Sequence, residues 1–511
     1  MKRTLSALSL LLVVLAVAVA VAPAPAAAQD FSRFVVIGDS LTHGYMSTCV
    51  VKYGQNDSWG AVVARAAGVD FQQPVMDDPG VGGCMYLTSL TPSFDFKPSV
   101  AKPLNALLPR PYNNLGVSGF TVADVVDKKG DTPPGLTDTV LRGQGTVLQQ
   151  ATVLAPTFVS VFIGNNDELG AIIYGLAVDG VTLTTRAAFK AKYDTILKTL
   201  VAAQGGIPRG TVATLPDSWS IPLMTTLPVY NTKTLGGPVI HKSGPYAGTP
   251  WRYTGSRDGQ ELPFGSLINL LGAAPLLPKG FGVACGMLDD FGYPAAGPLR
   301  AVCDKPAYGL PEGKWDATKF VFTPGVVAYP ETVAKVQARL AEFNTDIKAL
   351  AVTYGYKVFD VNAVFTDILG HGRDYGGMAI KTAYLSGGFF SYDGVHLTSV
   401  GYAILADEYI QFINRTFVNP LPRPNLMSIL LNGNTSGGWF PLPQGINLSL
   451  EEQLAFAADY AEKGGLEGLQ KVFAPTIPTD FSELQPGDDS APVTGSHGLG
   501  SHGRGSTETA H

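Results

Sequence analysis

The chain has 511 residues and a formal net charge of −6, and only 15% of its residues are charged. This composition argues against nucleic acid as a partner, because phosphate binding requires clustered Lys and Arg and the sequence has no basic cluster. The hydrophobic content of 45% is enough for a large core. The 59 Gly and 37 Pro residues predict long ordered loops rather than a minimal fold.

The first 28 residues have the pattern of a signal peptide. Two basic residues precede an apolar run over residues 5–21, and Ala26–Ala28 supply the small side chains that a signal peptidase needs. We therefore expect cleavage before Gln29 and export to the periplasm, the cell envelope or the medium. An uncleaved membrane anchor is the alternative.

Four short apolar runs predict the strands of a parallel sheet, because runs without polar alternation suit strands buried on both faces. They cover residues 34–37, 158–163, 211–215 and 357–361. Apolar residues recur every three or four positions over residues 331–354, which predicts a helix with Gly355 as its C-cap. A second amphipathic helix is predicted over residues 399–417. A strand that follows a helix in this way indicates an α/β fold, a three-layer α/β/α sandwich with large loop insertions.

The predicted main domain spans residues 29–417 and contains an insertion at about 225–330, rich in Gly, Pro and aromatic residues. Residues 418–486 are expected to form a C-terminal extension packed on the core. Within it, Ser449–Glu452 has the pattern of a capping box that opens a short helix. Residues 487–511 have almost no apolar side chains, which predicts a disordered tail.

Cysteine usage agrees with export. The chain has four cysteines, Cys49, Cys84, Cys285 and Cys303, and an even number in an oxidising compartment predicts two disulfides. Three pairings are open, and we expect Cys49–Cys84 and Cys285–Cys303 because each pair closes a Gly-rich loop. Free buried thiols are the alternative. None of the spacings is typical of a zinc site, and we expect no metal.

Polar residues with catalytic chemistry stand near the ends of the predicted strands, where parallel sheets bind their ligands. Ser40 follows the first strand, and Asn165 and Asn166 follow the second. Asp393 and His396 are three residues apart, a spacing that a tight turn can bring within hydrogen-bond reach. A serine nucleophile needs an imidazole base, an acceptor that orients the imidazole, and fixed donors for the oxyanion.

The chain resembles the GDSL-type lipases and esterases of the SGNH hydrolase superfamily. The resemblance rests on four blocks in the family's order, over about residues 34–417. They are Gly38-Asp39-Ser40-Leu41, Asn114-Leu115-Gly116-Val117-Ser118-Gly119, Gly164-Asn165-Asn166-Asp167 and Asp393-Gly394-Val395-His396. The insertions within that range are not explained by it.

The resemblance implies that Ser40 is the nucleophile, His396 the general base and acid, and Asp393 the residue that orients His396. It implies an oxyanion hole made by the amides of Ser40 and Gly119 and the side chain of Asn166. Gly116 and Asn165 are the alternatives for the last two positions. No cofactor is implied.

Three further polar residues are given structural roles. We expect Asp39 to cap a turn and Asp167 to accept hydrogen bonds that fix its loop. His43 lies near Ser40 in the sequence but has no carboxylate at a suitable spacing, so we expect it to line the cleft or lie on the surface.

The implied activity is hydrolysis of carboxylic esters through an acyl-enzyme, with lipid or acyl esters as substrates and transient contact with a lipid surface. A carbohydrate acetylesterase and an acyltransferase are alternatives, and so is a non-catalytic binding protein of the cell envelope. The aromatic residues of the 225–330 insertion could line an acyl cleft, form a lid or pack as a small subdomain.

Overall fold

The computed structural model describes residues 29–463, except for residues 90–92, 97–98, 100–101, 133, 232–237, 376, 418–419 and 433–448. The predicted signal peptide and the predicted disordered tail lie outside the described residues. Within the described part of the chain, no helix has both the length and the apolar character needed to cross a membrane.

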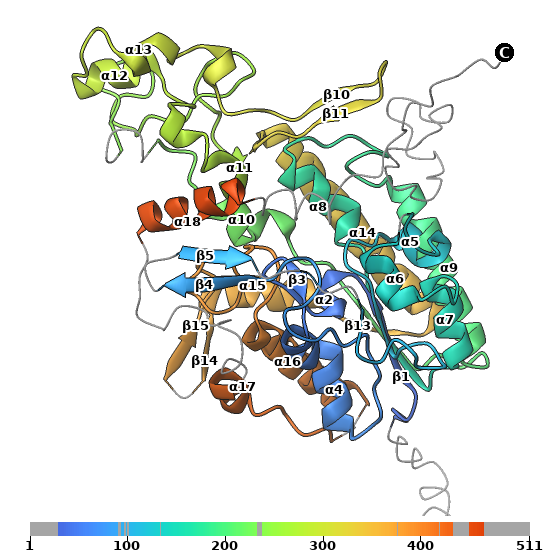
Figure 1. The fold of residues 1–511 in the computed structure, drawn as a ribbon. Helices are drawn as coiled ribbons and strands as arrows, with labels where there is room; N and C mark the ends of the chain where they lie inside the picture. The colour runs from blue at the N-terminus through green and yellow to red at the C-terminus, as the bar shows by residue number, and fades with distance from the viewer. Residues whose placement is uncertain are drawn as a thin grey trace, which may run out of the picture.

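A five-stranded parallel sheet forms the centre of the molecule, as the sequence predicts (Figure 1). Its order is β13-β8-β7-β1-β6, with the bounds β1 Phe34–Gly38, β6 Asn114–Gly116, β7 Phe158–Phe162, β8 Gly210–Ala213 and β13 Lys357–Phe359. All residues of β1 and β7 are buried, which explains why these strands lack polar alternation. The predictions missed β6, because three residues are too few to show a periodicity.

Helices cover both faces of the sheet and give the molecule three layers (Figure 1). One face carries α4 (Trp59–Ala67) and α16 (Ser399–Phe417), which pack against each other. The other face carries α5 (Val122–Asp127), α7 (Val147–Leu154), α9 (Arg186–Ala203) and α14 (Pro330–Tyr354). The helices predicted over 331–354 and 399–417 are therefore confirmed, and the α/β class with them.

The pair α9–α14 shows what stabilises this outer layer. The rings of Phe189 and Phe343 stack with their centroids 3.8 Å apart. At the edge of the contact, Arg186 donates to the buried carboxylate of Asp346 at 2.8 Å. Gly355 ends α14 with a left-handed backbone (φ 79°), as its place after the apolar pattern predicts.

The fourth predicted strand ends earlier than expected. It was predicted to reach Val361, but β13 ends at Phe359, because the side chain of Asp360 accepts from the Ala363 amide and starts a helix. This helix, α15 (Val361–His371), was not predicted. It brings two residues to the site described below.

The 225–330 insertion packs as a subdomain that is joined to the main core. Its strands β9 (Leu267–Ile268) and β12 (Val327–Ala328) pair, and buried residues of this region belong to the main hydrophobic core. A second, smaller core is centred on Met287 and Leu288 of α12 (Cys285–Phe291). The remaining elements of the insertion are α11 (Leu270–Ala273), α13 (Pro298–Val302), β10 (Lys314–Asp316), β11 (Val321–Thr323) and the short 3-10 helices η2 (Leu277–Lys279) and η3 (Pro306–Tyr308).

Both disulfides form with the predicted pairing, Cys49–Cys84 and Cys285–Cys303. The first connects the hairpin of β2 (Tyr45–Met46) and β3 (Cys49–Val50) to the start of β4 (Met85–Ser89), which pairs with β5 (Ser93–Phe96). The second fastens α12 to the end of α13.

The described part of the C-terminal extension consists of two helices, α17 (Leu426–Asn432) and α18 (Leu450–Glu462). The predicted capping box is present at α18, since the Ser449 amide donates to Glu452 and the Glu452 amide donates to the Ser449 hydroxyl. Helix α17 packs on α16, and α18 packs on α11 of the insertion. The extension therefore contacts both the core layer and the insertion.

Candidate active site

Ser40 lies at the tight turn that leaves the central strand β1. Asp39 caps the short helix α2 (Ser40–His43), with its carboxylate accepting from the Leu41 amide at 3.0 Å. A Cβ atom at Gly38 would lie 2.0 Å from Oγ1 of Thr42, so only glycine fits there. The turn role expected for Asp39 is confirmed, and the geometry holds Ser40 at the carboxyl end of the sheet.

Asp393 and His396 form the hydrogen bond that their spacing predicts. Nδ1 of His396 and Oδ2 of Asp393 are 2.9 Å apart, and both side chains are buried. An ionised carboxylate only accepts, so the proton of this bond lies on Nδ1. Nε2 of His396 is then the nitrogen that can take a proton.

The carboxylate of Asp393 is stabilised in its charged form. Burial alone would raise its pKa, but the charge of His396 and the hydrogen bonds from His396 and Val395 lower the pKa to about 2. Oδ1 accepts from the amides of His396 at 2.8 Å and Val395 at 3.0 Å, and from the hydroxyl of Ser391 at 3.1 Å. Asp393 is thus ionised at any pH near neutrality.

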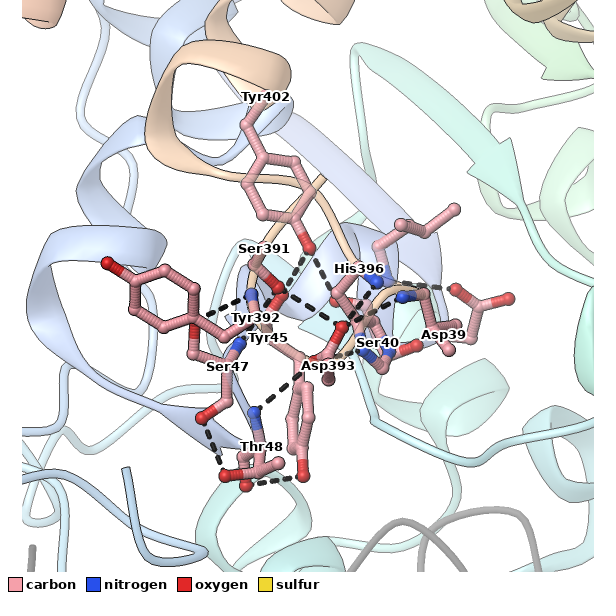
Figure 2. A network of polar contacts seen from close by, with 12 residues as sticks. Asp39, Ser40, Tyr45, Ser47, Thr48, Ser391, Tyr392, Asp393, His396 and Tyr402 are labelled. Atoms are coloured by element: carbon pink, nitrogen blue, oxygen red, sulfur yellow. Dashed lines mark hydrogen bonds and ion pairs between the residues drawn. The ribbon is translucent and has the colours of Figure 1, made fainter. Parts of the chain in front are cut away.

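A second set of contacts reaches Asp393 from the β2–β3 hairpin, far away in the sequence (Figure 2). The Thr48 amide donates to Oδ2 of Asp393 at 3.2 Å, and the Ser47 amide donates to Oγ of Ser391 at 3.0 Å. Ser47 and Thr48 both have positive φ, which is uncommon for residues other than glycine. The sequence analysis missed this turn, because nothing in a Ser-Thr pair reports a contact 345 residues away.

Aromatic side chains enclose the same network. The ring of Tyr45 lies 4.6 Å from the imidazole of His396, centroid to centroid, and its hydroxyl donates to the carbonyl of Thr48. From α16, the hydroxyl of Tyr402 donates to the carbonyl of Tyr45 at 2.5 Å and to that of Ser40 at 3.5 Å (Figure 2). These contacts fix the Asp393–His396 pair and the turn that carries Ser40 relative to one another.

Ser40 and His396 line one pocket, which encloses about 550 Å³ of empty space including its mouth. Asn165 and Asn166 line it as well, so the structure brings together residues of three of the predicted blocks. The apolar part of the wall includes Leu41, Leu169, Ile221, Phe365, Leu369 and Phe390. Phe365 and Leu369 come from the unpredicted helix α15, one turn apart.

Of the three predicted oxyanion donors, Ser40 and Asn166 line this pocket, whereas Gly119 is not part of its wall. In the described chain, the amides of Ser40 and Gly119 have no hydrogen-bond acceptor. Nδ2 of Asn166 donates one proton to the carbonyl of Phe120 at 2.9 Å, and its second proton remains for a ligand. Because Phe120 follows Gly119, this bond fixes the Asn166 side chain next to the Gly119 turn.

The alternatives for the donor positions have other partners. The Gly116 amide lies in β6 and donates to the side chain of Asn114 at 2.9 Å. Nδ2 of Asn165 donates to Oδ2 of Asp39 at 2.7 Å and so supports the serine turn. Asn165 still lines the pocket, so its second proton keeps it as an alternative to Asn166.

Asp167 has the loop-fixing role that we expected. Its carboxylate accepts from the Val122 amide at 2.9 Å and joins the start of α5 to the start of α8 (Asn166–Ile173). Burial raises the pKa of Asp167 to about 8, against the effect of that hydrogen bond. This side chain is therefore largely protonated at neutral pH.

The expectation for His43 was wrong. The imidazole is fully buried, it is not part of the pocket wall, and burial lowers its pKa to about 3. Nδ1 lies 3.2 Å from the hydroxyl of Ser118, so His43 joins the serine turn to the loop after β6. A neutral buried histidine with a hydroxyl partner serves packing rather than proton transfer.

The insertion does not line the acyl cleft that we considered for it. Every described residue of the pocket wall lies outside 225–330. The wall is built by α2, the start of α8, the loop after β8, α15 and the segment before α16. Of the insertion's aromatic residues, Tyr253 is buried in the main core and Trp251 packs on the smaller core, whereas Phe264 is 49% exposed. Comparisons of the chain with family models, curated proteins and solved structures gave no match.

The first disulfide should matter for activity as well as for stability. Cys49 follows Thr48, and the Thr48 hydroxyl donates to the carbonyl of Gly83, next to Cys84. Replacing both cysteines by serine should cost about 3–4 kcal/mol of stability through the released loop, and it should also lower kcat because the Thr48 contact to Asp393 loosens.

The matched control is the double serine variant of Cys285 and Cys303, which should lower the melting temperature while leaving kcat nearly unchanged. Thermal unfolding and ester turnover, both measured well below the melting point, test this. Equal kcat in the two double variants would contradict the role given to the hairpin.

The raised pKa of Asp167 predicts how stability changes with pH. The unfolded chain loses this proton near its ordinary pKa of 3.8, whereas the folded protein keeps it to about 8. Between these values the folded state binds more protons, so its stability falls as pH rises, by at most about 1.4 kcal/mol per unit for one group.

Asp167→Asn removes that proton difference. The free energy of unfolding of this variant should therefore decline less steeply between pH 5 and pH 8 than that of the wild type. Urea denaturation in a series of buffers measures it. Parallel curves for the two proteins would show that Asp167 is ionised in the folded state.

Proposed function

We propose that the protein is an exported serine hydrolase that cleaves carboxylic esters, of the GDSL type of the SGNH superfamily. The observation that carries the proposal is the 2.9 Å bond between His396 and Asp393 in a pocket that Ser40 also lines. A nucleophile, a base with its orienting carboxylate, and spare amide donors are the parts that acyl transfer requires. The layered α/β fold agrees with that superfamily.

The reaction proceeds in two steps. Nε2 of His396 takes the proton of the Ser40 hydroxyl as its oxygen attacks the ester carbonyl, while Asp393 holds the imidazolium that forms. The amides of Ser40 and Gly119 and the side chain of Asn166 donate to the oxyanion. The alcohol leaves with the proton from His396, and water then releases the acid by the same route. This chemistry requires no metal or organic cofactor.

Each oxyanion donor has a large effect in reactions of this kind. Loss of one donor typically costs about 2.7–4 kcal/mol of barrier. The Asn166 donor is the only one of the three that a side-chain substitution removes, since the other two are backbone amides. Its bond to Phe120 holds it in place before substrate arrives, so no reorganisation is needed during the reaction.

The pocket wall favours esters with an apolar acyl part over acetylated sugars. Eight of its residues are aliphatic, aromatic or proline, among them Leu169, Phe365 and Leu369. An acyltransferase would use the same residues, with an alcohol in place of water in the second step. The alternative outside the enzymes is a non-catalytic binding protein of the cell envelope that has a hydrolase fold.

Ser40→Ala should abolish both turnover of p-nitrophenyl esters and labelling by a fluorophosphonate, because the hydroxyl is the only group that forms the covalent bond. Ser243→Ala, at an exposed position of the insertion, is the matched control and should retain both. Peptide mapping of the labelled wild type should find the probe on Ser40. Folded wild-type protein that takes no label would favour the non-catalytic binding protein.

Acyl preference separates the esterase classes. If the acyl chain occupies the apolar wall, each added methylene should contribute about 0.8 kcal/mol, or roughly fourfold in kcat/KM, until the pocket is full. We therefore expect kcat/KM for p-nitrophenyl esters to rise from acetyl through butyryl and beyond. A sharp fall beyond butyryl would instead indicate removal of small acyl groups.

A further inference from the structure

The pocket contains two carboxyl groups that the proposed mechanism does not use. Glu168 of α8 and Asp217, before the short helix η1 (Ser218–Ser220), both line it together with Ser40 and His396. Among the described residues of the pocket wall there is no Lys or Arg. Two carboxyl groups thus face a largely apolar space without a Lys or Arg partner among the described residues of its wall.

Glu168 is held with one oxygen free for a ligand. The side chain is 1% exposed, and Oε2 accepts from the hydroxyl of Ser218 at 2.5 Å. Oε1 has no hydrogen-bond partner among the described residues. A buried carboxyl with an unused oxygen is costly to keep unless something pairs with it, and the pocket is the space from which a partner can come.

Aromatic rings complete the surroundings of these carboxyl groups. Phe365 of α15 and Phe390 line the same pocket. Ring faces attract cations, and the attraction is stronger where water is excluded. Carboxyl groups and phenyl rings together form the environment in which substituted ammonium groups bind.

We propose that this pocket recognises an ammonium group carried by the ester substrate, with Glu168 and Asp217 as its negative partners and Phe365 and Phe390 as its aromatic wall. The proposal rests on the proposed function, since it names the substrate class of the same site. A cation is favoured over a neutral hydroxyl group, because a positive charge in the pocket would favour the ionised forms of Glu168 and Asp217 and no Lys or Arg of the described pocket wall competes with it.

Ionisation of Glu168 sets the conditions for a test. Burial, opposed by the Ser218 hydrogen bond and reinforced by the charges of Asp167 and Asp217, raises the pKa of Glu168 to about 8. The assays are therefore run at a pH just above the pKa of Glu168, where its carboxylate is formed. The titratable groups that face Glu168 are Asp167, Asp217 and His396. Charged and neutral substrates both need neutral His396 as the base, so its protonation affects both members of a pair equally.

The experiment compares pairs of esters that differ by one atom. One arm uses butyrylcholine and its neutral isostere, in which carbon replaces the ammonium nitrogen of the alcohol. The other arm uses p-nitrophenyl esters of trimethylglycine and of its carbon isostere, which place the same groups on the acyl side. The full mature chain is assayed, and the ratio of kcat/KM within each pair is the readout.

We expect the charged ester to be preferred on the order of tenfold in one of the two arms, which also tells whether the ammonium group lies on the alcohol or the acyl side. Glu168→Gln should reduce that ratio to near one. The matched control is Glu331→Gln, an exposed position on α14 outside the pocket, which should keep the wild-type ratio.

A ratio near one in both arms for an enzyme that hydrolyses the neutral esters would overturn the ammonium proposal and leave the serine mechanism standing. A ratio that survives in Glu168→Gln would overturn the role of this residue. Failure of the proposed function itself is distinct, because no ester in either arm would then be turned over and no fluorophosphonate would bind.

Discussion

The site depends on a carboxylate that is buried and charged at the same time. Asp393 is fully buried, where an isolated charge would be costly, yet it accepts hydrogen bonds from five donors. One of them is Nδ1 of His396, and this bond fixes both the tautomer and the direction of the imidazole. If the other four donors were lost, the pKa of Asp393 would rise and the base would lose its orientation.

Those donors come from two distant parts of the chain, and this explains much of the surrounding architecture. The segment 391–396 supplies three of them from its own turn, whereas the amide of Thr48 comes from the β2–β3 hairpin. Three features hold that hairpin against the Asp393–His396 pair. They are the Cys49–Cys84 disulfide, the positive φ angles of the hairpin turn and the hydrogen bond from the Tyr402 hydroxyl. The parts of the fold that first look like loops thus support the buried carboxylate of Asp393.

Three other carboxyl groups, at the serine turn or at the start of α8, have the opposite electrostatic character. Asp39, Asp167 and Glu168 are buried with raised pKa values, so these carboxyl groups are held with their protons near neutral pH or partly so. Of these four groups only Asp393, which accepts hydrogen bonds from His396 and from the Val395 amide, is held firmly ionised. The environment assigns different protonation states to four carboxyl groups, all of them near one serine turn or the pocket beside it.

Sequence reasoning located the sheet and the Asp393–His396 pair but not the contacts that support them. Buried strands such as Phe158–Phe162 carry a continuous apolar signal, and the Asp393–His396 spacing implies a turn, so both were predicted correctly. Contacts that join distant segments leave no local signal. For this reason the predictions missed the contact of the Ser47–Thr48 turn with Asp393 and the contribution of α15 to the pocket wall. His43 was misplaced for the same reason, because its burial is decided by packing against the loop at Ser118.

The central claim is that Ser40 carries the acyl group during turnover. The most direct measurement is to mix the protein with excess p-nitrophenyl butyrate, quench with acid while turnover proceeds, and map the butyrylated peptide by mass spectrometry. The account predicts one butyryl group, on the peptide that contains Ser40, and no butyryl group on that peptide in Ser40→Ala. A butyryl group on another residue, or steady turnover with no acylated peptide, would contradict it.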